Sequence, residues 1–414
     1  MPIDRIRAME LHRRAKGKIK IYPTINIVNE EDLSIAYIPG SVGPCEAIRE
    51  DVEASYDLTG RGNRIAVITD GSAVLGLGDI GPEAALPVME GKCLLFKLFG
   101  DVNALPICLD SRKPEDIIHT AELLAPGLGG FNIEDISSPN TFTVVQELQK
   151  KVSIPVLCDD QHGTAVVILA ALRNALEVVG KSIEKVSIVI CGAGAAGLSV
   201  ADLLMKAGAT GLTLLNSAGI LAPGNPRMNH IQVDFSTRTN PEGRSGGLSE
   251  AIRGADVFIG LSKGCLFEPD FVKSMASNPV IFAQALPEPE ISPEAAKAAG
   301  AAVVASGLYD YPNVISNLQS TPGIMRGALD VRAASLNDRI FLAAASALAS
   351  VVDRRTLSPN HIMPDLFCDE VVPKVAEAVA QAAVEEGLAA HPLPKGQVYT
   401  DTWERLFGGR ASRL

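Results

Sequence analysis

The chain has 414 residues, of which 47% are apolar and 21% charged, and its net charge at neutral pH is −11. A chain of this length exceeds the size at which one hydrophobic core stops growing, so we expect two domains. The acidic balance predicts no nucleic-acid partner, because such surfaces gather Lys and Arg. No apolar run reaches about 18 residues and no signal-peptide core is found, which predicts no membrane partner and a cytoplasmic location.

Seven cysteines are scattered along the chain, and none forms a Cys-x-x-Cys pair. This spacing argues against both a disulfide framework and a zinc site. We therefore expect reduced, mostly buried cysteines.

The first 160 residues mix short apolar runs with glycine-rich joints, a pattern typical of a compact α/β unit. The runs are IAVIT at 65–69, CLLFKLF at 93–99 and ALPICL at 104–109. These residues, 1–160, are predicted to form the first domain.

A long apolar helix pattern at 164–180 opens the second half of the chain. Strand-like runs then alternate with helical patterns, which predicts a doubly wound parallel sheet in a domain over 161–385. The polar stretch 225–247 is typical of a loop over the cleft, a helix follows from about 371, and 386–414 forms a tail. The strand-like runs are 186–190, 212–216, 256–262, 279–285 and 301–306.

A Gly-x-Gly-x-x-Gly turn follows the run at 186–190 directly. Gly192 would permit the tight turn, Gly194 would let the backbone approach a pyrophosphate, and Gly197 would let the next helix pack on the strand. The helix N-terminus beyond the turn favours an anion. The pattern predicts an NAD or NADP site lined by Gly192, Ala193, Gly194, Ala195, Ala196 and Gly197.

Two acidic pairs end apolar runs, Glu134-Asp135 and Asp159-Asp160. Adjacent carboxylates repel each other unless a cation or a proton intervenes, and Mg²⁺ or Mn²⁺ prefers such oxygen ligands. The alternative that these residues only cap helices stays open. His162, three residues after the second pair begins, is expected to be a hydrogen-bonded histidine at a helix start rather than a ligand.

Lys92 stands at the start of an apolar run, where partial burial would depress its pKa toward the range of a general base. Tyr37 precedes a Pro-Gly turn and could donate a proton. A surface lysine and a tyrosine packed on its turn are the alternatives.

These fragments occur together and in order, and the chain resembles the malic enzyme family in its short bacterial form from about residue 10 to about 385. The strings that carry the resemblance are AYIPGSVGPC, VITDGSAVLGLGDIGPEAALPVMEGKCLLFK, NIEDI, PVLCDDQHGTA, GAGAAG, DYPNVISN and PGIMRGALD.

The resemblance implies oxidative decarboxylation of a 2-hydroxy acid, with hydride transfer to a nicotinamide and a divalent metal at the 2-oxygen. It implies an N-terminal malic-enzyme domain, a C-terminal Rossmann-type domain and a homodimer or larger homo-oligomer. Lys92 matches the family's general base and Tyr37 its general acid, and Asp159 is a neighbouring proton-handling carboxylate. The implied metal ligands are Glu134, Asp135 and Asp160, and Ser262 and Asn317 are placed at the cofactor.

Three positions depart from the family pattern. Leu286 replaces an asparagine, and Ser316 replaces the first asparagine of a pair whose second member is Asn317, so the substrate pocket is expected to differ there. Asn216 stands where an acidic residue commonly binds the adenosine ribose, and no Lys or Arg follows within several residues, which places NAD slightly ahead of NADP. Another 2-hydroxy acid as substrate, or a catalytically weak dinucleotide-binding regulator, are the alternative functions.

Overall fold

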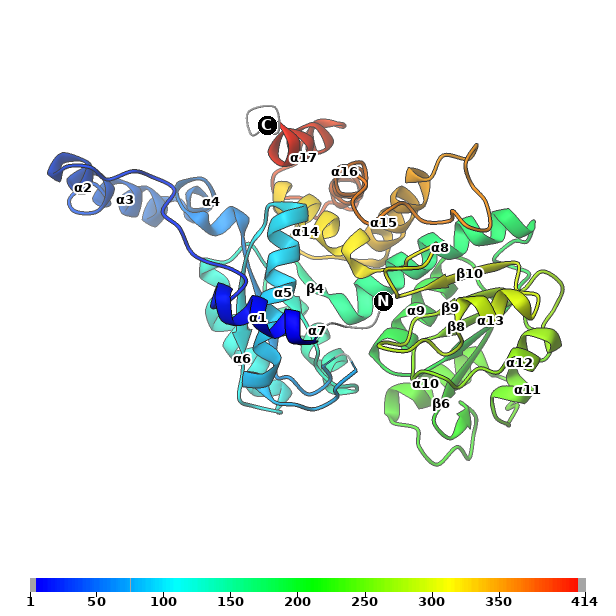
Figure 1. Cartoon of the computed structure of the whole chain (residues 1–414). Helices are drawn as coiled ribbons and strands as arrows, with labels where there is room; N and C mark the ends of the chain where they lie inside the picture. The colour runs from blue at the N-terminus through cyan, green and yellow to red at the C-terminus, as the bar shows by residue number, and fades with distance from the viewer. Residues whose placement is uncertain (1–4, 75, 409–414) are drawn as a thin grey trace.

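The computed structural model describes residues 5–74 and 76–408 and has two β-sheets, one in each half of the molecule (Figure 1). The first sheet is parallel throughout, with strand order β2-β1-β3-β4. Its strands are β1 (Arg64–Thr69), β2 (Asn103–Cys108), β3 (Gly130–Ile133) and β4 (Val156–Cys158). Helices α5 (Pro82–Gly100), α6 (Pro114–Leu124) and α7 (Asn140–Lys151) connect them.

The second sheet has the order β10-β9-β8-β5-β6-β7 and is parallel except at β7. Its strands are β5 (Ser187–Cys191), β6 (Gly211–Asn216), β7 (Gly219–Ile220), β8 (Val257–Gly260), β9 (Val280–Ala283) and β10 (Val303–Ser306). The strand order reverses at β5, which pairs with β6 on one side and β8 on the other. A crevice at the carboxyl end of the strands is expected at such a switch point. The predicted α/β class and doubly wound sheet are confirmed.

Helices α9 (Ala195–Lys206), α10 (His230–Thr239), α11 (Leu248–Ile252), α12 (Pro269–Ser274) and α13 (Pro293–Ala298) belong to the second half. The prediction of a polar loop over 225–247 is wrong for α10. Asn229 caps this helix by accepting from the Gln232 N–H, while the Gln232 side chain accepts from the Asn229 N–H. This reciprocal pair begins a helix in a sequence of low apolar content.

The two halves are joined without a linker. The one-turn π-helix η4 (Asp159–Gly163) runs directly into α8 (Thr164–Val179), and α8 lies in one hydrophobic core with residues of both sheets. Together η4 and α8 are long and apolar enough to cross a membrane, but 67% of that window is buried inside the protein, as in a core helix.

Helices beyond β10 cover the top of both halves (Figure 1). Arg326, which is fully buried, donates to the Asn63 side chain and pairs with Asp330, and so ties the C-terminal part of the chain to the first half. The predicted tail contains a helix whose Val398 and Thr402 are buried. These elements are η5 (Asn317–Gln319), α14 (Thr321–Asp330), α15 (Asp338–Val351), α16 (Val371–Glu385) and α17 (Gln397–Phe407).

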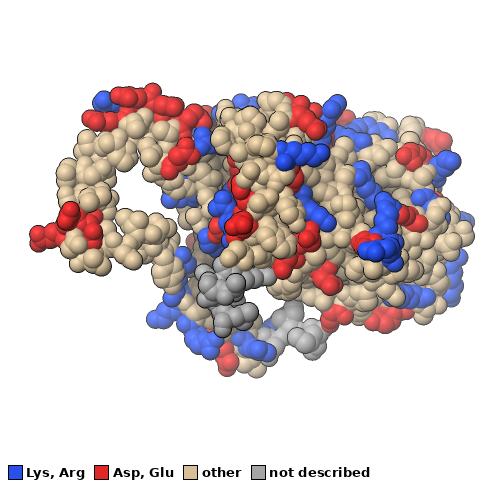
Figure 2. Space-filling model, turned by 90° about the horizontal axis from the view of Figure 1, so that it is seen from above, with Lys and Arg blue, Asp and Glu red and all other residues tan. Residues whose placement is uncertain are grey.

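An arm made of residues 21–50 stands out from the body of the molecule (Figures 1 and 2). It carries α2 (Glu30–Ala36) and α3 (Val42–Glu50), neither of which has a buried residue, whereas α1 (Arg5–Ala15) lies beside α5 in Figure 1. After the arm, α4 (Ser55–Leu58) leads back to β1. The arm exposes the apolar side chains Ile21, Tyr22, Ile25, Ile27, Val28, Leu33, Ile35, Tyr37, Ile38 and Val42.

Candidate active site

The acidic pairs lie together at the carboxyl edge of the first sheet. Strands β3 and β4 are parallel neighbours, with Ile133 opposite Cys158, so the residues that follow each strand meet at the same edge. Glu134 follows β3 and Asp159 follows β4, and both are almost fully buried, with 4% and 2% exposed. Chain positions 25 residues apart thereby form one acidic cluster.

Lys92 projects from α5 into this cluster. Its Nζ lies 2.8 Å from Asp159 Oδ2 and 3.1 Å from Glu134 Oε1. Asn132 donates to the other Glu134 oxygen at 2.7 Å, and Asn317 donates to Asp159 Oδ2 at 2.7 Å. The lysine is therefore held in a fixed position inside a hydrogen-bonded network rather than on the surface.

The electrostatics of Lys92 differ from the expectation. Burial alone lowers the pKa of Lys92, but the charges of Asp159 and Glu134 outweigh it and raise that pKa above its ordinary value. The prediction of a depressed Lys92 pKa is wrong in this setting, because the charges of the neighbouring carboxylates outweigh the effect of burial.

The carboxylates outnumber the positive charge at the site. Oxygens of Glu134, Asp159 and Asp160 lie within 4.8 Å of one another, and Asp159 Oδ1 is buried with no hydrogen-bond partner among the described residues. Burial first, and then the neighbouring Asp135 and Asp159, raise the pKa of Asp160 to about 7. This donor set suits a hard divalent cation, which would supply the missing charge.

Asp135 is predicted from the sequence to be a metal ligand with Glu134 and Asp160. Its backbone N–H donates to Asp160 Oδ2 at 2.8 Å, and its φ of 53° is left-handed, which turns the chain sharply after Glu134. The compact group of oxygens contains Asp159 in place of Asp135. A ligand role for Asp135 stays a prediction.

Tyr37 does not lie with Lys92 in this chain. It ends α2 on the arm, with 64% of its surface exposed, and its neighbours in a shallow surface depression all belong to the arm. Of the predicted catalytic residues, the structure brings together Lys92 and Asp159 and leaves Tyr37 apart.

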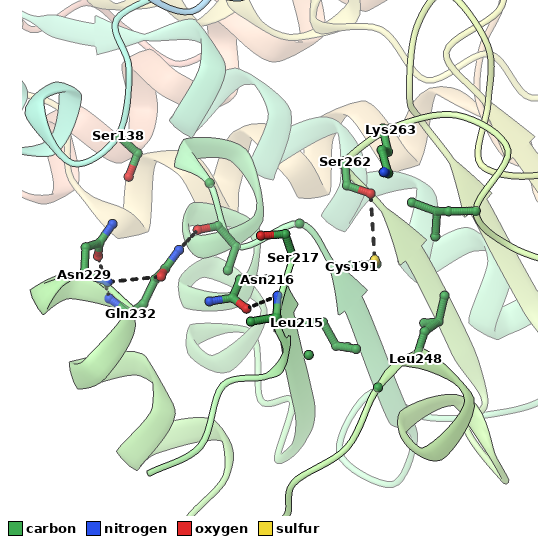
Figure 3. A pocket seen from close by; sticks show the side chains of 17 residues that line it. Ser138, Cys191, Leu215, Asn216, Ser217, Asn229, Gln232, Leu248, Ser262 and Lys263 are labelled. Atoms are coloured by element: carbon green, nitrogen blue, oxygen red, sulfur yellow. Dashed lines mark hydrogen bonds between the residues drawn. The ribbon is translucent and has the colours of Figure 1, made fainter. Parts of the chain in front are cut away.

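The glycine turn forms one wall of a pocket of about 890 Å³ at the switch point (Figure 3). Gly192 has a φ of +118°, and a Cβ there would lie 2.3 Å from the Leu261 carbonyl. A Cβ on Gly197 would lie 1.8 Å from the Gly192 carbonyl, whereas Gly194 at the start of α9 has nothing within 4 Å. Thus two glycines are required by the fold, and Gly194 leaves open space for a ligand.

Models of two protein families cover most of the chain: the malic enzyme N-terminal domain matches residues 15–149 and the malic enzyme NAD-binding domain matches residues 161–384. The chain belongs to the malic enzyme family.

Similar proteins include the bifunctional malic/malolactic enzyme of Bacillus subtilis, 47% identical over 92% of this chain and 93% of that protein. The NAD-dependent malic enzyme of Geobacillus stearothermophilus is 46% identical over 90% of this chain and 78% of that protein. The crystal structure of malic enzyme from Pyrococcus horikoshii has a TM-score of 0.93 at 40% identity, covering 100% of this chain and 98% of that one. The resemblance read from the motifs is confirmed, and the chain is an NAD(P)-linked oxidoreductase of the malic enzyme type.

Other residues of this family member line the nucleotide pocket, and sequence reasoning missed some of them. Ser138 reaches it from the first half of the molecule, as Figure 3 shows. Gln232 of α10 donates to the Ala193 carbonyl at 2.6 Å and so fixes the glycine turn. The Asn229-x-x-Gln232 spacing is a capping signature that could have revealed α10; nothing in the sequence marked Ser138.

The predicted cofactor residues Ser262 and Asn216 both line this pocket, on different walls. Ser262 follows β8 and its N–H donates to the buried Glu290, while Asn216 ends β6. Asn317 lies instead at the acidic cluster, where it donates to Asp159 and to Thr164. Its predicted contact with the cofactor stays a prediction.

The two departures in the predicted substrate pocket have local roles. Ser316 caps η5, because its Oγ accepts from the Leu318 N–H and its backbone N–H donates to Gln319. It thereby positions Asn317, the next residue. The half-buried Leu286 lies beside Gly307, and its carbonyl approaches Gly76 of the first half.

His162 is a hydrogen-bonded histidine, in agreement with the sequence-based expectation. Its Nδ1 accepts from the Cys158 N–H at 3.1 Å, and its ring stacks on Phe341. Burial, with a smaller contribution from Lys206, lowers the pKa of His162 to about 4, so the ring is neutral at physiological pH. It supports the turn that carries Asp159 and Asp160.

Proposed function

We propose that this chain catalyses the divalent-metal-dependent oxidative decarboxylation of malate to pyruvate and CO₂, with reduction of NAD(P)⁺. The observation that carries the proposal is Lys92 held between Glu134 and Asp159, beside the further carboxylate Asp160. Relatives whose names describe them as malic enzymes support malate as the substrate.

The residues that would hold the metal are Glu134 and Asp160, with Asp135 or Asp159 as the third. The donor set fits, because three clustered carboxylate groups face one ammonium and Asp159 Oδ1 has no hydrogen-bond partner in the part of the chain that the structure describes. When bound, Mg²⁺ or Mn²⁺ polarises the 2-oxygen of the substrate and neutralises the carboxylates that hold the proton on Lys92.

Proton transfer at C2 falls to Lys92 and Asp159. Lys92 is held as an ammonium by Glu134 and by its 2.8 Å contact to Asp159 Oδ2, and it can act as a base once this proton has been lost to solvent. The neutral amine then takes the proton of the C2 hydroxyl. Asn317 keeps Asp159 in place by donating to the same oxygen.

The nucleotide pocket takes its lining from both halves of the molecule. Ser138, three residues beyond Asp135, lines it from the first half, and η5 carries Asn317 from the second half to Asp159. A bound nicotinamide would accept the hydride from C2. The burial of Glu134 and Asp159 would limit the access of water to the product enolate.

The direct test is nicotinamide reduction at 340 nm with Mn²⁺ for L-malate, D-malate and other 2-hydroxy acids. Formation of pyruvate from L-malate is expected. Turnover of another acid, with no turnover of malate, would show that malate is not the substrate. The pocket around Leu286 would then be the part of the site that selects the acid. Cofactor binding without turnover of any acid would favour a regulatory role and contradict the proposal.

We further propose that the active unit is a homodimer or larger homo-oligomer in which Tyr37 acts on the site of another copy. Support comes from the arm, which stands out from the body (Figure 1), exposes many apolar side chains and places Tyr37 among other arm residues. Such an arm gains buried surface only against a partner. Tyr37 would then protonate the enolate carbon in that partner's site.

Co-expression of Lys92→Ala and Tyr37→Phe chains tests this arrangement. If each site takes Lys92 from one chain and Tyr37 from another, random pairing restores about a quarter of the wild-type activity per site. If each site takes both from one chain, no mixed pair has an intact site and activity stays at the level of the single variants.

We also propose that the protein is located in the cytoplasm. Cell fractionation tests this proposal separately.

A further inference from the structure

The loop after β6 folds back on the end of that strand and brings a cation to the nucleotide pocket. Asn216 organises this loop: its Oδ1 accepts from the Ala218 N–H at 2.8 Å, and its Nδ2 donates to the Arg227 carbonyl at 3.2 Å. Asn225 bonds to the same amide through both of its side-chain atoms, at 3.1 and 3.3 Å. The Asn216 side chain is therefore fully engaged in holding the loop.

Arg227, eleven positions after Asn216, is placed by these bonds. Its Nη1 donates to Ser217 Oγ at 3.1 Å, and Ser217 lines the pocket (Figure 3). The arginine is exposed, and within residues 5–74 and 76–408 it makes no ion pair with a carboxylate. An arginine without an acidic partner thus stands beside a hydroxyl at the edge of the pocket.

The end of β6 is the place where a Rossmann-type domain meets the adenosine ribose. A carboxylate there would bond to the ribose 2′-hydroxyl and would repel a 2′-phosphate. This chain has the neutral Asn216, the hydroxyl of Ser217 and the guanidinium of Arg227 instead. A guanidinium and a hydroxyl are suitable donors for a phosphate, and a guanidinium can bind it through two N–H groups.

We propose that Arg227 and Ser217 bind the 2′-phosphate of the adenosine ribose, and that this chain binds NADP(H) more tightly than NAD(H). The inference rests on the proposed function, which it deepens by selecting the cofactor. It replaces the expectation from the sequence, which favoured NAD because no Lys or Arg closely follows Asn216. The positive charge near Asn216 belongs to Arg227, eleven positions later in the chain, because the loop folds back onto the end of β6.

Fluorescence titration of the whole protein with NADPH and with NADH, without substrate or metal, tests the inference independently of activity. A hydrogen bond to a charged group contributes about 1.5–3 kcal/mol, so NADPH is expected to bind about 10- to 140-fold more tightly. Arg227→Gln should remove most of this difference while leaving NADH binding unchanged. Arg227→Lys should keep part of it, because the charge remains.

Arg253→Gln is the matched control, since it removes the same charge from an exposed position outside the pocket lining. It should leave the NADPH preference intact. Equal binding of NADPH and NADH by the wild type, or tighter binding of NADH, would overturn the inference while leaving the proposed function standing.

A preference for NADPH that survives Arg227→Gln would overturn the assignment to Arg227. Binding of neither nucleotide would overturn the proposed function itself. Thermal unfolding of each variant establishes that it is folded, and Ser217→Ala, which removes only a hydroxyl, provides a second variant with a smaller expected loss.

Discussion

The acidic cluster and the nucleotide pocket are built in different ways. The cluster buries charge, with Lys92 against Glu134 and Asp159, and removing Lys92 would leave buried carboxylates without their cation. The pocket is lined by glycines, apolar side chains, neutral polar groups and one lysine, and its glycine turn leaves space for a ligand to approach the backbone. Substitutions in the cluster should therefore act through electrostatics, and substitutions of the glycines in the turn through sterics.

The largest expected effect comes from Lys92→Ala. Loss of a general acid–base group lowers kcat by about 10²- to 10⁴-fold. The buried carboxylates lose their cation, so the melting temperature should fall as well. Steady-state kinetics and circular dichroism check both. Lys97→Ala, on the same helix but half exposed and paired with Asp101, is the control; equal loss of activity in both variants would contradict a special role for Lys92.

Stabilisation of the protein by a bound metal should depend on the carboxylates of the acidic cluster. At 100 times its dissociation constant, Mn²⁺ is expected to add about 2.7 kcal/mol to the free energy of unfolding. Glu134→Gln should reduce this gain, and Glu122→Gln, which changes a surface carboxylate paired with Lys151, should not. Thermal unfolding with Mn²⁺ or EDTA measures it. Stabilisation that is independent of Glu134 would place the ion elsewhere.

Two glycines of the same turn should separate folding from binding. Gly197→Ala forces a methyl group against the Gly192 carbonyl and is expected to cost about 1–3 kcal/mol of stability. Gly194→Ala places its methyl group in open space, so the melting temperature should be unchanged while dinucleotide affinity falls. Scanning fluorimetry and nucleotide titration distinguish the two; unchanged affinity in Gly194→Ala would show that the backbone approach is not needed there.

The smallest expected effect on kcat concerns Asn317, which donates to a carboxylate of the acidic cluster. Asn317→Ala removes the donor to Asp159 Oδ2, and kcat is expected to fall about tenfold. Thr164→Val removes the other partner of Asn317 but keeps the bond to Asp159, so its loss should be smaller. If the two variants lose equal activity in steady-state assays, Asn317 acts through the packing of α8 rather than through Asp159.

Much of the fold could be predicted from the sequence because the signals are local. The buried strands are visible as apolar runs, and the turn at Gly192 required a positive φ that glycine supplies. Both acidic pairs were visible for the same reason, since each directly follows a strand. The helix α10 was missed because its start depends on a pair of capping side chains rather than on apolar periodicity.

The sequence by itself determined most of the buried strands, the glycine turn and the family, since these follow from short-range patterns and from ordered motifs. Only the tertiary structure decided how charges from distant positions meet. It gave Lys92 two carboxylate partners that reverse the effect of burial on its pKa, and it returned Arg227 to the end of β6. Electrostatic interactions depend on distance in space, which separation along the chain does not specify.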